Sequence, residues 1–96
     1  MQLKGPQRTM TLRIEKSVRQ EFTVFSLVGR IEEEHIEELE GLFDLHKEAR
    51  SVVLDLQEVR LADREAVKFL ARCEAVGVQL ENCPAYIREW VKREKP

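Results

Sequence analysis

A short apolar run, followed by a polar turn and an amphipathic helix, is the feature that most limits how this chain can fold. The run Val52-Val53-Leu54-Asp55-Leu56 is rich in β-branched residues. It is too short for a helix and too continuous for a strand with one solvated face, so it predicts a central, largely buried strand. A turn from Gln57 to Ala62 then leads to Asp63, whose carboxylate can accept hydrogen bonds from free amides at a helix start.

Two further strands and a helix are predicted before this run. Met10, Leu12 and Ile14 alternate with polar residues, which is typical of a strand with one wet face. A second strand is expected over Phe22 to Val28, ending at Gly29, and the polar segment from Lys16 to Glu21 suits a hairpin connection. A helix from Glu32 to Lys47 follows, because its apolar residues recur three and four apart: Ile36, Leu39, Leu42 and Phe43.

Three more elements are predicted after Asp63. A helix from Arg64 to Ala75 ends at Val76-Gly77, and a strand over Val78 to Leu80 follows it. Pro84 suits the first turn of a last helix, whose buried residues are expected to be Ile87, Trp90 and Val91. Strands that alternate with helices favour parallel pairing through right-handed crossovers, and the opening hairpin adds an antiparallel strand. The order β-β-α-β-α-β-α therefore predicts an α/β fold, a small four-stranded mixed sheet with helices packed on it.

Length and composition fit one small globular domain. The chain has 96 residues, of which 43% are hydrophobic and 35% charged, with a formal net charge of −2. This charge argues against nucleic acid as the main partner. Because no apolar run approaches the roughly 20 residues that span a bilayer and no signal peptide is visible, we expect a cytoplasmic protein without a membrane partner. We expect residues 1–8 to form a flexible leader and residues 9–96 a single domain.

The residues that usually carry catalysis or bind metals are sparse. His35 and His46 lie eleven residues apart, too far to share an ion, and are expected to be ordinary surface or core-edge residues. Cys73 and Cys83 lack CxxC spacing and are expected to be reduced structural thiols. No serine elbow and no glycine-rich phosphate loop is present. We therefore expect no enzyme activity, no cofactor and no metal.

Asp55 is unusual because it lies within an apolar strand, where a carboxylate needs a hydrogen-bond partner. The simpler interpretation is that Asp55 anchors a loop. The functional interpretation is that Asp55 and Asp63 act as paired acids.

The segment around Asp63 resembles the STAS domain, a family named for sulfate transporters and anti-sigma factor antagonists. The matching features are the strand with its internal Asp55, the connection to Asp63, the following helix, and Gly77 before the next strand. In the family pattern, Asp-Ser-x-Gly stands at the helix start, where this chain has Asp63-Arg64-Glu65-Ala66. The resemblance covers about residues 9 to 92 and implies the same α/β architecture.

Arg64 is the main departure from the family pattern. In regulated STAS proteins a kinase that is also the anti-sigma factor phosphorylates the serine, and the added negative charge abolishes partner binding. Arg64 cannot receive that phosphate and does not mimic it, because it places a cation where the phosphorylated form has an anion. Three interpretations stay open: an ordinary exposed residue, a constitutive contact with an acidic partner, or local pairing with Glu32 or Asp63.

The resemblance implies a non-enzymatic regulatory module that binds a protein, either an anti-sigma factor or a related kinase-like regulator. Glu32 follows the turn after the second strand, where the family often has Asp beside the phosphorylation loop. We therefore expect partner contacts around Glu32, Asp63, Arg64 and Glu65. The alternatives are a domain that senses a small ligand or nucleotide, and a structural homodimer. The glutamate-rich helix start is a solvated face or a contact for a basic partner.

Overall fold

The computed structural model describes residues 12–42 and 49–94. In chain order, the described elements are β1 (Leu12–Arg19), β2 (Phe22–Ile31), α2 (Glu33–Leu42), the short 3-10 helix η1 (Ala49–Ser51), β3 (Val52–Ala62), α3 (Arg64–Ala75), β4 (Gln79–Glu81) and α4 (Ala85–Glu94). This order confirms the predicted alternation. None of the described helices is long and apolar enough to cross a bilayer.

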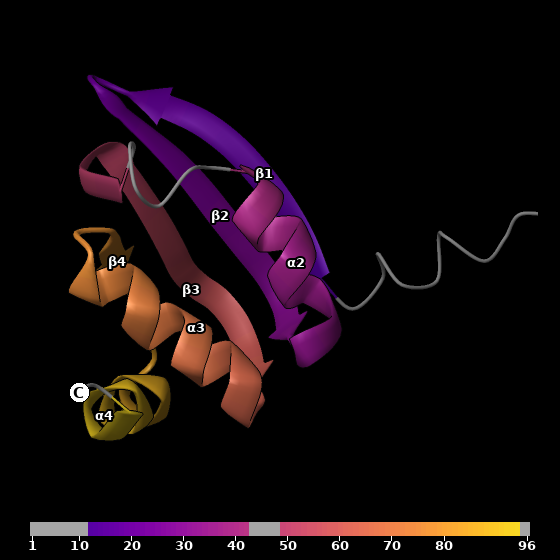
Figure 1. Cartoon of the computed structure of the whole chain (residues 1–96). Helices are drawn as coiled ribbons and strands as arrows, with labels where there is room; N and C mark the ends of the chain where they lie inside the picture. The colour runs from indigo at the N-terminus through magenta and orange to yellow at the C-terminus, as the bar shows by residue number, and fades with distance from the viewer. Residues whose placement is uncertain (1–11, 43–48, 95–96) are drawn as a thin grey trace, which may run out of the picture.

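The four strands form one sheet in the order β1-β2-β3-β4 (Figure 1). β1 pairs with β2 antiparallel, whereas β2 with β3 and β3 with β4 pair in parallel. The predicted mixed sheet, with an antiparallel hairpin at its beginning, is therefore confirmed.

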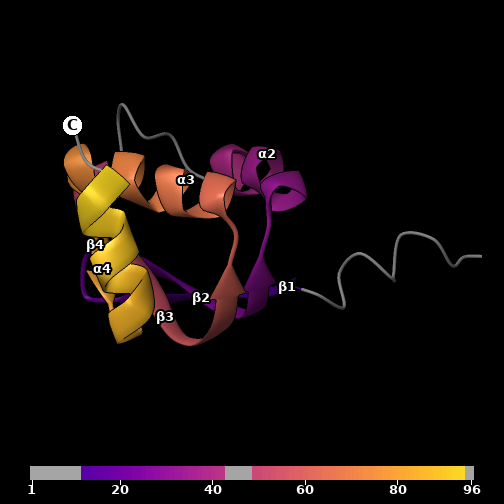
Figure 2. The same ribbon diagram turned by 90° about the horizontal axis from the view of Figure 1, so that it is seen from below.

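Helices α2 and α3 lie side by side over one face of the sheet, and α4 stands at the side of this arrangement (Figure 2). The core forms between the sheet and these helices. Phe69, on α3, is fully buried there. Most apolar residues of the three helices point into this core, as the amphipathic pattern requires. Besides Phe69, those that are fully buried are Leu39, Ala66, Val67, Leu70, Cys73, Ile87 and Val91.

The first two strands are longer than the sequence pattern predicted. β1 continues through the polar segment to Arg19, and only Gln20 and Glu21 form the turn, with Gln20 at a φ of 58°. β2 does not end at Gly29 but continues to Ile31, whose side chain is fully buried. The prediction was wrong because the outer half of an edge strand carries polar residues that sequence patterning assigns to a loop.

The predicted turn from Gln57 to Ala62 is also strand. β3 reaches Ala62, which pairs with Ile31, and two register shifts give β3 two more residues than β2 over the paired length. Such bulges interrupt the alternation of inward and outward side chains, so the second half of β3 looks like a polar connection in the sequence. The burial of Val59 and Ala62 holds this half of the strand on the core.

The helix predictions hold with small changes. α3 has the predicted bounds, and α2 begins one residue later than predicted; Phe43 to Lys47 lie outside the described residues. β4 is shifted by one residue, and α4 begins directly after Pro84 with Trp90 half-buried. The predicted leader (residues 1–8) and residues 9–11 of the predicted first strand also lie outside the described residues.

Candidate functional site

The predicted partner residues lie where β2 and β3 end and the chain enters α2 and α3. Because the two strands are parallel neighbours, both ends lie at the same edge of the sheet. Their last pair is Ile31 with Ala62, and the Asp63 amide donates a hydrogen bond to the Ile31 carbonyl at 3.1 Å. The two connections rise side by side (Figure 2). We call this region, residues 31–35 and 62–66, the paired junction.

Asp63 joins the two helix starts of the paired junction. Its Oδ1 accepts a hydrogen bond from the Ala66 amide at 2.9 Å, which confirms the predicted N-cap of α3. Its Oδ2 accepts a second bond from the Glu33 amide, also at 2.9 Å, at the start of α2. A carboxylate beside the positive ends of two helix dipoles is electrostatically favourable. One side chain therefore links the starts of α2 and α3.

His35 completes the start of α2. The residue is 4% exposed, so the surface position that was one of its two predicted environments is wrong. Its Nδ1 accepts a hydrogen bond from the Glu32 amide at 3.0 Å. In a capping box a Glu or Gln at the third helical position makes this bond, and His35 occupies that position. Its spacing of three residues from Glu32 is the sequence signal that could have identified it. His46 lies outside the described residues.

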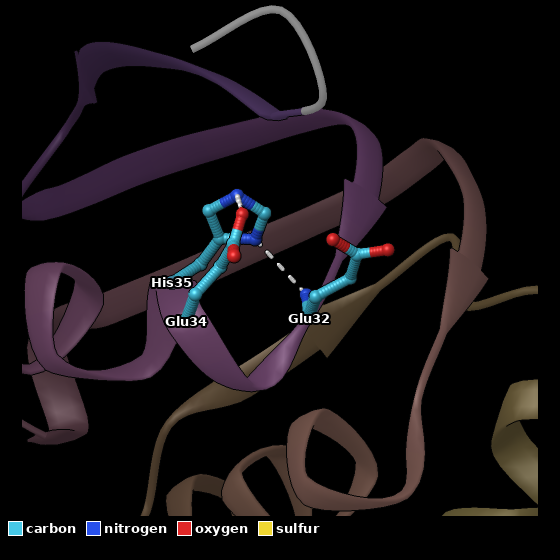
Figure 3. Close-up of side chains that lie close together, drawn as sticks. All are labelled: Glu32, Glu34 and His35. Carbon is cyan, nitrogen blue, oxygen red and sulfur yellow. Dashed lines mark hydrogen bonds and ion pairs between the residues drawn. The ribbon is translucent and has the colours of Figure 1, made fainter. Parts of the chain in front are cut away.

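Glu32, Glu34 and His35 place potential metal ligands within 4.8 Å of one another (Figure 3). The hydrogen bond to His35 argues against a metal there. A Nδ1 atom that accepts a bond carries no proton, so the proton of the neutral ring is on Nε2, which lies 3.7 Å from a Glu34 carboxylate oxygen. A metal ion would need a free lone pair on one of these two nitrogens, but Nδ1 uses its lone pair for the hydrogen bond and Nε2 carries the proton. The cluster therefore fits a helix cap better than a metal centre.

Substitution of His35 tests this capping role. We expect His35→Ala to lower the free energy of unfolding by about 1–2 kcal/mol, because the Glu32 amide loses its acceptor. We expect His35→Gln to lose less than half as much, since Gln is a common capping-box residue. Urea denaturation at neutral pH measures both changes. Equal losses in the two variants would contradict the capping role.

Arg64 and Glu65 extend from the first turn of α3 into solvent. The Arg64 side chain is 69% exposed, and its Nε lies 3.9 Å from a carboxylate oxygen of Glu94 on α4. Local pairing with Glu32 or Asp63, one of the three open interpretations, is replaced by a loose pair with Glu94, which contributes little energy at such exposure. Glu65 forms a similar exposed pair with Lys68 at 3.5 Å. Both side chains are therefore accessible to a partner.

The α2 side of the paired junction is strongly acidic. Two open hollows lie there, both lined by Glu33 and Glu37. Their other lining residues are Glu32, Glu34 and Asp63 in one, and Ile36, Glu40, Glu65 and Arg72 in the other. Small-molecule sites are usually enclosed and mainly apolar. These hollows instead form a charged, solvated surface.

Asp55 lies in the first half of β3, away from the paired junction, and has a structural role. Its Oδ1 accepts hydrogen bonds from the Gln57 amide and from Asn82 Nδ2, each at 3.1 Å. This confirms the loop-anchoring interpretation. Asp63 lies eight positions further along the chain, a distance of about 26 Å at the usual rise of a strand. The interpretation of Asp55 and Asp63 as paired acids is therefore wrong.

The two cysteines are free. Burial raises the pKa of the Cys73 thiol to about 12, against a smaller opposing effect of Arg72. Burial also raises the pKa of Cys83, with Arg88 opposing it. Because the thiolate is the reactive form, neither residue is poised as a nucleophile at neutral pH.

Comparisons with known proteins identify the fold. No family model matches the chain, and no curated protein matches its sequence. Similar solved structures include two anti-sigma factor antagonists. One is an anti-sigma factor antagonist STAS domain from Rhodobacter sphaeroides, with a TM-score of 0.59 and 12% identity over 92% of this chain and 99% of that one. The other is the anti-sigma factor antagonist SpoIIAA in its unphosphorylated form, with a TM-score of 0.60 and 20% identity over 84% of this chain and 81% of that one. The chain therefore has the fold of a STAS domain.

Proposed function

We propose that this chain is a regulatory protein-interaction module whose partner binds at the paired junction. The observation that carries the proposal is the double hydrogen bond of Asp63, which fixes the helix start from which Arg64 and Glu65 extend into solvent. A rigid element that presents charged side chains needs little reorganisation to bind. Solved structures of similar fold are described as anti-sigma factor antagonists, so the partner class we favour is an anti-sigma factor or a related kinase-like regulator in the cytoplasm.

Because residue 64 is an arginine, phosphorylation at that position cannot switch this interaction off. A guanidinium has no hydroxyl that could accept a phosphoryl group, and its charge is permanent at physiological pH. The partner should therefore present carboxylates to Arg64, where a phosphoserine would repel them. Any regulation of this module would act at another position.

Two observations favour binding over catalysis or ligand sensing. The cysteine thiols are protonated at neutral pH, and the hollows beside the junction are open and lined by carboxylates. An interaction surface needs neither an activated nucleophile nor an enclosed pocket.

Charge reversal at Arg64 tests the proposed function. The protein that the wild-type chain retains from a lysate of its native cell is first identified by mass spectrometry and then produced in pure form. We expect Arg64→Glu to weaken its binding at least tenfold in calorimetric titration, because a carboxylate would face the partner's carboxylates. Folding should be unaffected, since the first turn of a helix tolerates Glu.

Arg13→Glu provides the matched control. Arg13 lies on β1, its side chain is also 69% exposed, and it pairs with a glutamate, Glu15, at 3.0 Å. Its reversal should change the affinity less than twofold. Equal affinities of the Arg64→Glu and wild-type chains would exclude Arg64 from the interface and overturn the proposal.

A further inference from the structure

A second exposed surface adjoins the paired junction on the side of α4 and differs from the acidic α2 side. It consists of Arg30, Arg60, Leu61 and Tyr86, which we call the basic corner. Leu61 is 53% and Tyr86 49% exposed. Arg30 and Leu61 are register partners across β2 and β3, and the Tyr86 hydroxyl donates a hydrogen bond to the Arg60 carbonyl. The four residues thus converge from β2, β3 and α4.

A β-bulge exposes the central part of this corner. Gly29 pairs with Val59 and Arg30 pairs with Leu61, so Arg60 is an extra residue on β3. Bulges redirect side chains and often lie beside functional sites. Arg60 and Leu61 are both exposed, although successive residues of a regular strand point to opposite faces. The bulge therefore puts a large apolar side chain and a cation in solvent together.

The arginines of the corner differ from most cations of the chain. Most described Lys and Arg side chains have a carboxylate within 4.0 Å, as Arg19 does with Glu81. Arg30 and Arg60 have no carboxylate within that distance among residues 12–42 and 49–94. Two uncompensated cations beside exposed Leu61 and Tyr86 form a surface on which acidic and apolar groups of another protein would fit.

Helix α4 connects this corner to the proposed interface. Near its start Tyr86 bonds to the Arg60 carbonyl, and at its end Glu94 lies 3.9 Å from Arg64. α4 therefore follows the chain from the bulge to the first turn of α3. A partner that contacts Arg64 would find the basic corner on one side and the acidic face of α2 on the other.

We propose that the basic corner is the second contact area of the partner, and that it takes a protein segment with an apolar side chain flanked by carboxylates. This proposal rests on the proposed function. Tyr and Arg are enriched among the residues that dominate binding energy, and an apolar contact between them excludes water. The opposite charges of α2 and the corner would allow only one orientation of the partner.

The test uses the same purified partner and calorimetric titration as the Arg64→Glu experiment. We expect Arg60→Glu and Arg30→Glu each to weaken binding about tenfold, and Leu61→Ser to weaken it at least fivefold. Lys16→Glu and Val76→Ser are the matched controls, because Lys16 is an exposed cation on β1 and Val76 an exposed apolar residue at the end of α3. We expect both controls to stay within twofold. Circular dichroism and urea denaturation confirm that each variant folds.

The outcomes separate the two proposals. If Arg64→Glu weakens binding but folded variants of the corner match their controls, the corner is no contact area and the proposed function stands. If neither Arg64→Glu nor the corner variants change the affinity, both proposals fail. The wild-type chain and Arg60→Glu are also tested for binding to phosphatidylserine vesicles and to double-stranded DNA. If the wild-type chain binds either of them and Arg60→Glu abolishes that binding, the corner serves another class of partner and the inference is overturned.

Discussion

Replacing Asp63 with alanine is expected to lower the free energy of unfolding by about 2 kcal/mol. Loss of an N-cap alone costs about 1 kcal/mol, and the variant also loses the bond to the Glu33 amide at the start of α2. For a domain of this size each kcal/mol corresponds to a fall of about 4–8 °C in melting temperature. Urea denaturation and thermal melts measure the loss.

Asp63→Asn and Glu65→Gln are the controls for this prediction. Asparagine keeps one accepting oxygen, so it should retain one of the two bonds and lose about half as much stability. Glu65 lies in the same turn without capping a helix, and its variant should change stability by less than about 0.5 kcal/mol. In amide NMR spectra of Asp63→Ala, both Glu33 and Ala66 should shift. A shift confined to Ala66 would contradict the link between the helices.

The predictable parts of this fold are those that depend on neighbours in sequence. α3 was predicted with its exact bounds because its apolar face, its cap at Asp63 and its end at Gly77 all lie within fifteen residues. The central strand was recognised for the same reason, since Val52 to Leu56 is a continuous apolar run. Local signals of this kind agree with the final structure when packing reinforces them.

The unpredicted parts depend on residues that are distant in sequence. Asp63 accepts a bond from Glu33, thirty residues away, because two parallel strands end together. The bulge at Arg60 is defined by its register with β2, and Tyr86 reaches that bulge from a helix near the C-terminus. Periodicity and spacing contain no information on such contacts. The sequence could therefore locate one side of the site but not the basic corner.

The second large effect is expected at the end of α3, where Gly77→Ala should lower the free energy of unfolding by about 1–3 kcal/mol. Gly77 has a φ of +116°, a conformation that side chains rarely adopt, and its amide donates to the Glu74 carbonyl at 3.2 Å. A Cβ added there would lie 3.1 Å from Cγ of Arg50, so that side chain must also move. Urea denaturation of the variant measures the loss.

Gly41→Ala is the matched control because it makes the same chemical change in a different backbone conformation. Gly41 lies in α2, and nothing within 4 Å would contact an added Cβ. Alanine favours the helix and restricts the unfolded chain, so we expect a gain of about 0.4–1 kcal/mol. The two glycine variants should therefore change stability in opposite directions. A loss at both positions, or at neither, would show that the positive φ of Gly77 does not determine how α3 ends and the chain enters β4.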